Sequence, residues 1–370
     1  MSLQVIDVTK RYKGDTVLNG VSLEAAAGET IVLFGPSGAG KTVMLRVIAG
    51  VMEADEGRIL IGDQDMTAAE PEERGIGMAF QNFALVPHLT ARENIATPLV
   101  AQRRPAAEID ARVREVGDLL KIGHVLDHHP KALSNGQKQR TALGRALAGT
   151  PSVLLLDDPL RNVDAKLRFE MRLELPRLLK DGRTTVVYVT QDYKEAMALG
   201  DRIAVLGQGR IEQVGTPSQI YLEPATVGIA RLFGDPVINL LDVVPRAGAD
   251  GTVVEVAGTE IVLDAGYSGA AGRTCTLGLR PEALRFVQAG TSGAFAVEVE
   301  AETPLNEKVV TLIEVEGHGE MLLSRPNGTP GPASGTAHVA LAPEAAGGTL
   351  LFEREGGRRV VPSGRARAAA

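Results

Sequence analysis

A glycine-rich stretch, GPSGAGKT, carries the clearest chemistry in the sequence. It follows the apolar run IVLF and precedes a helix-like segment, VMLRVIAG, so it would link a strand to a helix. Glycines at this spacing let backbone N–H groups turn toward phosphate oxygens, and the helix N-terminus adds the positive end of its dipole. We predict that Lys41 reaches the β- and γ-phosphates of a nucleotide and that Thr42 offers its hydroxyl to Mg²⁺. The alternative interpretation is a flexible glycine turn. The predicted nucleotide-binding residues of this loop are Gly35, Pro36, Ser37, Gly38, Ala39, Gly40, Lys41 and Thr42.

Two adjacent carboxylates form the second candidate site. The stretch VLLLDDPL places Asp157 and Asp158 directly after a run of apolar residues. A buried strand that ends in acids at the edge of a sheet is a common position for a metal ligand or a catalytic base. The glycine-rich loop alone does not decide between kinases, switch GTPases and transport ATPases.

Composition limits the classes of protein to which the chain can belong. Its 370 residues, 44% of them hydrophobic, are enough for about two domains. The single cysteine, Cys275, allows no internal disulfide, which favours a reducing, cytoplasmic setting. The net charge of −7, with acids and bases mixed, argues against a nucleic-acid partner. No apolar run approaches the ~18 residues that would span a bilayer, so we expect any membrane association to pass through a partner.

The first part of the chain, up to about Gly234, alternates apolar runs with helical patterns. The runs ETIVLFG, SVLLLD, TTVVYVT and DRIAVLG are typical of strands buried on both faces. Between them lie the helix-like segments AAEIDARVREVGDLLKI, GQKQRTALGRALA and DAKLRFEMRLELPRLLK. This alternation predicts an α/β domain with a largely parallel sheet. Pro176 lies inside the last helical segment, where we expect a kink or a local break.

The remainder of the chain has a different pattern of apolar and polar residues. Segments such as GTVVEVAG, CTLGLRPEALRF, AFAVEVEAET and KVVTLIEVEG are short, partly alternating and separated by Gly, Pro and Asn. They predict an all-β domain of the small-barrel type. We therefore divide the chain into a nucleotide-binding domain, 1–234, with a helical subdomain at about 82–150, and a β-rich domain, 235–370. We expect the second domain to help dimerisation or regulation, and its tail to fray after about residue 361.

Longer motifs make the chain resemble the ABC ATPases. The stretch ALSNGQKQRTALGRALAGTPSVLLLDDP is similar to the signature and Walker B block of that family, in the same order. GIGMAFQNFALVPHLTARENI resembles its glutamine loop, and YVTQDYKEAMALGDRIAVLGQGRIEQVGTP resembles its switch region and the hairpin that follows. FGDPVINLLD and LRPEALRF look like the C-terminal region of the sugar-importer branch, the maltose and glycerol-3-phosphate type. The resemblance implies an α/β P-loop ABC ATPase domain with a helical subdomain, followed by an all-β C-terminal domain of small OB-like barrels.

The resemblance also implies roles for individual residues. Tyr12 would stack on adenine, although by itself it looks like an ordinary strand aromatic. Gln81 would contact Mg²⁺ and the attacking water, and would sense the membrane subunit. Asp157 would hold Mg²⁺ together with Thr42 and Gln81. Asp164 would face its counterpart across a dimer.

A signature sequence would act on the nucleotide of a second subunit. Ser134 would cap the helix that follows it, and that helix end would present N–H groups to the γ-phosphate held by the opposite subunit. The signature residues are Ser134, Asn135, Gly136 and Gln137. Asn135 departs from the family, which usually has Gly at this position, and this change could weaken the contact. The alternative interpretation is that Ser134 is only a helix cap.

Two departures from the family affect hydrolysis rather than binding. Asp158 stands where active relatives usually have Glu as the residue that positions or deprotonates the attacking water, and its carboxylate is about 1–1.5 Å shorter in reach. Gln191 replaces the switch histidine; its amide can donate a hydrogen bond but does not titrate. Arg161 replaces a usual Ser and is either functional or a solvated charge. We predict from these substitutions that the half-site hydrolyses ATP slowly. The alternative interpretation is that the substitutions are neutral drift in a fully active enzyme.

The predicted function is that of an ATP-binding subunit that powers an importer for a carbohydrate, polyol or glycerol-type solute. Its cofactors would be ATP, sandwiched at a dimer interface, and Mg²⁺. Its partners would be a second, non-identical ATP-binding subunit with intact Glu and His, two transmembrane permease subunits and, indirectly, a solute-binding protein. The chain would lie on the cytoplasmic face of the membrane. The alternatives are a nucleotide-gated scaffold with little turnover and a soluble ABC ATPase of DNA repair or translation, which usually has coiled-coil insertions or two cassettes that are lacking here.

Overall fold

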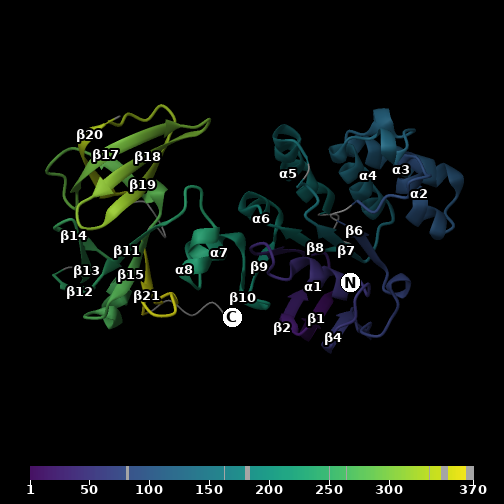
Figure 1. Ribbon diagram of the computed structural model, residues 1–370, viewed down its shortest axis with the longest axis horizontal. Coiled ribbons are helices and arrows are strands. Elements are labelled where there is room, and N and C mark those ends of the chain that lie inside the picture. Colours follow the sequence, from purple (N-terminus) through teal and green to yellow (C-terminus); the bar gives the residue numbers. More distant parts are fainter. Residues whose placement is uncertain are drawn as a thin grey trace. The chain divides into compact units, whose positions relative to one another are not determined.

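The chain forms two compact units, Met1–Pro217 and Ser218–Ala370. The structure, a computed structural model, describes residues 1–80, 83–161, 163–179, 184–249, 251–263, 265–332, 334–342 and 349–363 (Figure 1). Among these residues, no helix is both long and apolar enough to cross a membrane.

The division between the units lies earlier in the chain than the predicted boundary after Gly234. Helices α7 (Pro217–Leu222) and α8 (Val227–Leu232) precede that boundary, yet all but the first residue of α7 belongs to the second unit. The reason is Arg280, a residue of the second unit that is 2% exposed. Its guanidinium donates hydrogen bonds to backbone carbonyl oxygens in and just after these helices, those of Tyr221, Ala230 and Phe233.

Two sheets form the frame of the first unit. The larger sheet has the order β10-β9-β3-β8-β7-β6 and is parallel except for the antiparallel pair β9–β10. This confirms the predicted, largely parallel sheet. The smaller sheet is antiparallel, with the order β2-β1-β4-β5. The strands are β1 (Leu3–Tyr12), β2 (Asp15–Ala25), β3 (Thr30–Phe34), β4 (Glu56–Ile61), β5 (Gln64–Asp65), β6 (Ile76–Ala79), β7 (Val153–Asp157), β8 (Thr185–Thr190), β9 (Arg202–Gly207) and β10 (Arg210–Gly215).

One hydrophobic core joins the two sheets and helix α1 (Lys41–Ile48). Every residue of β3, β7 and β8 is buried, as expected for strands covered on both faces. The core side chains of α1, such as Met44 and Leu45, are fully buried between strands of both sheets. The carboxyl ends of β3, β7 and β8 therefore lie next to one another at one edge of a rigid, packed layer, where ligands of open α/β sheets usually bind.

Three helices form the helical subdomain: α2 (Ala91–Ala101), α3 (Ala106–Leu119) and α4 (Asn135–Ala148). They meet closely at Gly144, where an added Cβ would lie 3.1–3.3 Å from side-chain atoms of Val116, Leu120 and Ile95. A capping box at Thr90 starts α2, and another at Ser134 starts α4.

Helix α5 (Ala165–Leu179) follows the acidic end of β7, and α6 (Tyr193–Leu199) follows β8. Pro176 lies within α5, yet the helix continues past it, so the predicted break does not occur. The ring of Pro176 removes one N–H donor from α5, and the helix ends soon after it, at Leu179.

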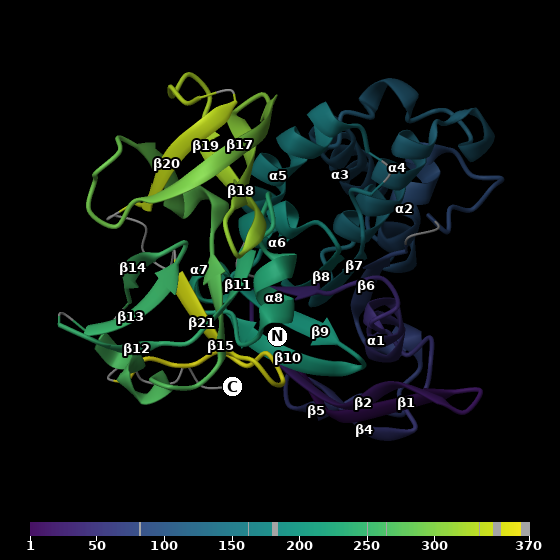
Figure 2. The ribbon, with the colours of Figure 1, turned by 60° about the vertical axis from the view of Figure 1, so that its left-hand side comes forward.

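The second unit is β-rich, as predicted. Its antiparallel sheets have the orders β11-β15-β21, β12-β13-β14 and β16-β20-β17-β18-β19, and they enclose a shared core that includes Leu277, Phe295 and Ile313. The longer strands curl instead of lying flat, as in a partly open barrel (Figure 2). The strands are β11 (Asn239–Val243), β12 (Arg246–Gly248), β13 (Gly251–Val256), β14 (Thr259–Val262), β15 (Cys275–Leu279), β16 (Leu284–Val287), β17 (Phe295–Pro304), β18 (Lys308–Val315), β19 (Gly319–Pro326), β20 (Gly335–Leu341) and β21 (Thr349–Glu353).

Candidate active site

The glycine-rich loop connects β3 to α1, as the sequence predicts. Its glycines are needed for steric reasons: a Cβ added at Gly35 would lie 2.2 Å from the backbone oxygen of Leu206 in β9. Gly38 and Gly40 have φ values of 82° and 103°, in the left-handed region that favours glycine. Gly40 is the N-cap of α1, so the loop ends at the positive end of that helix.

Lys41 is the first residue of α1 and its ammonium group is held by the loop itself. Its Nζ donates hydrogen bonds to the backbone oxygens of Gly35 and Pro36, each at 2.7 Å. Burial lowers the pKa of Lys41, while the nearby carboxylates of Asp158 and Asp157 act in the opposite direction. The ammonium group is thus a preorganised donor at the base of the loop.

Thr42 and Asp157 lie side by side at the same edge of the sheet. The Thr42 hydroxyl donates to Oδ1 of Asp157 over 3.2 Å. Asp157, the last residue of β7, is 3% exposed, and its burial raises the pKa of its carboxyl. A buried carboxylate beside a hydroxyl, both oxygen donors, fits the preference of Mg²⁺ for a few oxygen ligands plus water.

A cavity of about 340 Å³ collects the loop and both acids. It is lined by Val17, Ser37, Gly38, Gly40, Lys41, Thr42, Val43, Asp157, Asp158, Arg161, Val189 and Gln191. The structure therefore brings together the predicted phosphate-binding residues, the predicted magnesium ligand and both residues that depart from the family pattern. Arg161, which the sequence left open, also lines this cavity; its signal in the sequence was the departure from the usual Ser of the family.

Asp158 is fixed mainly by its backbone. Its φ of 50° is in the left-handed region, its N–H donates to Val189 O at 2.9 Å, and its carbonyl accepts from Gln139 Nε2 at 2.9 Å. Its side chain is 14% exposed, and Oδ2 lies 3.8 Å from a guanidinium nitrogen of Arg161. Burial raises the pKa of Asp158, and the Arg161 guanidinium partly opposes this.

Tyr12 and Asp164 are not among the residues that line this cavity. Tyr12, at the end of β1, is 58% exposed. Asp164 accepts a hydrogen bond from Leu167 N at 3.0 Å and so caps the start of α5. Gln81 lies outside the described residues.

The signature residues begin α4 in the helical subdomain. Ser134 Oγ accepts from Gln137 N at 3.3 Å, and Ser134 N donates to Gln137 Oε1 at 2.9 Å, which confirms the predicted helix cap. Asn135 and Gly136 form the first turn of α4. These residues are not among those that line the chain's own cavity. Their action on the nucleotide of a second subunit stays a prediction.

Two family models match the chain. The ABC transporter model matches residues 18–161, which include the glycine-rich loop, the signature residues and both aspartates. The TOBE domain model matches residues 277–351, within the β-rich second unit.

Relatives match most of the chain. The sn-glycerol-3-phosphate import ATP-binding protein UgpC of Cereibacter sphaeroides is 42% identical over 354 residues, 96% of this chain and 98% of the relative. The protein of the same name from Escherichia coli is 45% identical over 282 residues, 76% of this chain and 79% of the relative. A solved dimeric structure of a post-hydrolysis state of the ATP-binding cassette MJ0796, bound to ADP and Pi, is 34% identical with a TM-score of 0.54; the match covers 58% of this chain and 98% of that one.

Proposed function

Because the chain belongs to the ABC transporter family of ATP hydrolases, in its sugar-importer branch, we propose that it powers the import of a carbohydrate, polyol or glycerol-type solute. The family, the fold class and the enzyme class predicted from the sequence are confirmed. The observation that carries the proposal is the cavity that unites Lys41, Thr42 and Asp157 in a chain whose relatives are named as import ATP-binding proteins. The names of those relatives favour a glycerol phosphate among the possible solutes.

The cavity has the groups that ATP hydrolysis needs. Lys41 binds the β- and γ-phosphates, and the loop N–H groups and the N-terminus of α1 bind the remaining phosphate charge. Thr42 and Asp157, with Gln81 in our prediction, would hold Mg²⁺, which would supply charge neutralisation at the phosphates. These residues match the family pattern without change, so nucleotide binding is expected to be intact.

The hydrolytic residues differ from the family pattern, and the proposal therefore includes a slow half-site. Asp158 reaches about one methylene less far than the usual Glu, and a displacement of about 1 Å can reduce a rate on the order of a hundredfold. The guanidinium of Arg161, 3.8 Å away, is a second partner that competes with water for this carboxylate. Gln191 supplies an amide in place of an imidazole, and the amide does not accept or release a proton near neutral pH.

The proposed assembly is a pair of ATP-binding subunits on the cytoplasmic face of the membrane. The second subunit would carry the intact Glu and His, and Ser134–Gln137 of this chain would complete its site. ATP binds the closed pair better than the open pair and so shifts the population between them. Two permease subunits would receive this motion, and a solute-binding protein would deliver the solute.

The second candidate function is a nucleotide-gated scaffold that binds ATP with little turnover. The Asp158–Arg161 ion pair favours it, because the guanidinium opposes the rise in the pKa of Asp158 that burial causes. Single-turnover hydrolysis of ATP, with and without a partner ATPase subunit, separates the two candidates: the scaffold leaves ATP intact in both measurements.

The slow half-site is tested by restoring the family residues. The double variant Asp158→Glu with Gln191→His is expected to raise kcat about a hundredfold, with little change in ATP affinity. Asp127→Glu is the matched control, because it lengthens an acid whose side chain is 81% exposed. The idea fails if the unaltered chain, reconstituted with its permeases, already hydrolyses ATP at ordinary transporter rates, or if the double variant stays slow.

A further inference from the structure

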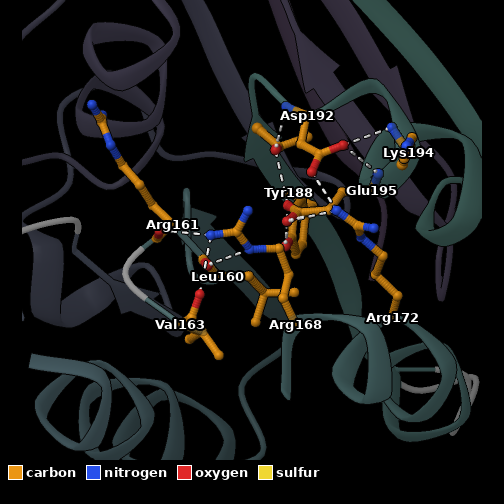
Figure 3. Close-up of polar contacts among 10 residues, drawn as sticks. Leu160, Arg161, Val163, Arg168, Arg172, Tyr188, Asp192, Lys194 and Glu195 are labelled. Atoms are coloured by element: carbon orange, nitrogen blue, oxygen red, sulfur yellow. Dashed lines mark hydrogen bonds and ion pairs between the residues drawn. The ribbon is translucent and has the colours of Figure 1, made fainter. Parts of the chain in front are cut away.

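Helix α5 carries two arginines one turn apart, Arg168 and Arg172, between the two loops that hold the altered residues. The first loop, here called the Asp158 loop, comprises residues 158–164, of which the structure describes all but residue 162. The second, the Gln191 loop, comprises residues 190–192 and leads into α6. Figure 3 shows Arg168 directed at the first loop and Arg172 directed at Asp192 and Glu195.

Arg168 binds the main chain of the Asp158 loop at several points. Its Nε donates to Leu160 O at 3.2 Å, and one terminal nitrogen donates to Arg161 O and Val163 O, each at 3.0 Å (Figure 3). The planar, five-donor guanidinium suits such a set of carbonyl oxygens, and a lysine could not reproduce it. Arg168 thus holds Leu160, Arg161 and Val163 by their carbonyl oxygens, beside the main-chain hydrogen bonds of this loop.

Arg172 binds the start of α6. It donates a hydrogen bond to the carboxylate of Asp192 and lies 4.0 Å from Oε1 of Glu195. Asp192 is the N-cap of α6 and accepts from the N–H groups of Lys194 and Glu195. The side chain of Arg172 is 17% exposed, so this charge pair is largely shielded from solvent.

Glu195 connects this cluster to β8. It is 2% exposed, and its Oε2 accepts from Tyr188 Oη and from Thr190 Oγ1, each at 2.9 Å. Thr190 is the residue immediately before Gln191, and its hydroxyl also accepts from Asp192 N at 3.0 Å. Arg172 thus contacts both carboxylates that fix the two ends of the Gln191 loop.

We propose that Arg168 and Arg172 are positioning residues that couple the Asp158 loop to the Gln191 loop through helix α5. The two arginines lie at i and i+4 of one helix, so they project from the same face and move together. A displacement of either loop is then transmitted to the other, and the distance between Asp158 and Gln191 is kept. This inference depends on the proposed roles of these two residues in hydrolysis.

The test is a double-mutant cycle on the full chain with Arg168→Met and Arg172→Met. Each single variant is expected to lower kcat about tenfold or more while the KM for ATP changes less than about twofold. If the two loops are coupled, the double variant is no slower than the slower single variant. Arg177→Met, at an exposed position of the same helix, is the matched control and leaves kcat unchanged. The inference would be overturned if the reductions in kcat of the two single variants multiply in the double variant, or if KM rises while kcat stays constant.

Hydrogen exchange separates positioning from a general loss of stability. Arg172→Met is expected to speed amide exchange in the Asp158 loop as well as in the Gln191 loop, although the hydrogen bond and ion pair described for Arg172 go to Asp192 and Glu195. Exchange that rises only around residues 190–195 would contradict the coupling. Arg172→Lys, which keeps the charge, serves if the methionine variant does not fold, and should give an intermediate result.

The measurements also distinguish this inference from the proposed function. If the unaltered chain is too slow for accurate kinetics, the cycle is measured in the Asp158→Glu, Gln191→His background. If that background is slow as well, the proposed slow half-site has failed, while the exchange measurement still supports or overturns the coupling.

Discussion

The phosphate side of the cavity, Gly35–Thr42, and its hydrolytic side, which carries Asp158 and Gln191, are held by different kinds of interaction. On the phosphate side the backbone itself sets the geometry: Gly35 has no space for a Cβ, and Lys41 is bonded to carbonyls of its own loop. On the hydrolytic side the main chain fixes Asp158, and side chains from another element add to this: the arginines of α5 bind the carbonyl of Arg161 and the carboxylate of Asp192. Three departures from the family pattern, Asp158, Arg161 and Gln191, line this side of the cavity.

The largest expected effect comes from the phosphate side. Lys41→Ala removes a preorganised ammonium, so hydrolysis should fall about 10²–10³-fold and ATP binding should weaken strongly. Binding can be followed with a fluorescent ATP analogue, and the absence of tryptophan from the chain keeps the background low. Lys121→Ala is the control, because its ion pair with Glu170 lies on the surface. Unchanged ATP binding by the Lys41 variant would abolish the distinction between the two sides.

A smaller loss of nucleotide affinity is expected from substitution of Tyr12, the residue predicted to contact the adenine base. If Tyr12 stacks on adenine, Tyr12→Ala should weaken ATP and ADP equally, by about tenfold, because base–aromatic stacking contributes about 1–3 kcal/mol. Tyr12→Phe keeps the ring and should bind as the unaltered chain does. A loss confined to ATP would instead place Tyr12 near the γ-phosphate, and no loss would remove it from the site.

The smallest effect concerns stability. Burial raises the pKa of Asp158 above its ordinary value of 3.8, so the native state binds this proton more tightly than the unfolded state. The contribution of Asp158 to stability is then fully present below that value and is lost as pH rises through the native pKa. Asp158→Asn should therefore raise the free energy of unfolding by about 1 kcal/mol near pH 7.5, and Tm by about 2–4 °C.

The pH dependence provides the check on this prediction. The gain in Tm should shrink as pH falls toward 4, and Asp127→Asn, at an exposed acid, should show no such trend. A loss of stability near pH 7.5 would mean that the ion pair with Arg161 outweighs burial, and the hydrolytic side would then be as firmly built as the phosphate side.

Patterns of short range were enough to predict much of the fold. The buried runs became β3, β7, β8 and β9, and the glycine-rich loop formed where a strand meets a helix. Such patterns are informative because a strand buried on both faces requires a run of apolar residues, and a left-handed backbone conformation favours glycine. The cap at Ser134 was predictable for the same reason.

Contacts between distant residues could not be predicted in this way. Arg168 and Arg172 look like ordinary charges of an amphipathic helix, and their carbonyl and carboxylate partners become neighbours only after the sheet has formed. Arg161 gave no sign that it would face Asp158. The boundary between the units was placed too late because nothing in FGDPVINLLD shows that α7 and α8 pack on a residue about fifty positions further along the chain, Arg280.

Arg280 also sets where the protein can be cut and rejoined. Its guanidinium lies 3.9 Å from the ring centre of Tyr221 and binds carbonyls in and just after α7 and α8. A junction after Gly234 would discard those partners and leave a buried cation without acceptors, a costly arrangement. A junction at Ser218 keeps them. The β-rich unit therefore begins at residue 218, and a chimaeric subunit joined there would keep every one of these contacts of Arg280.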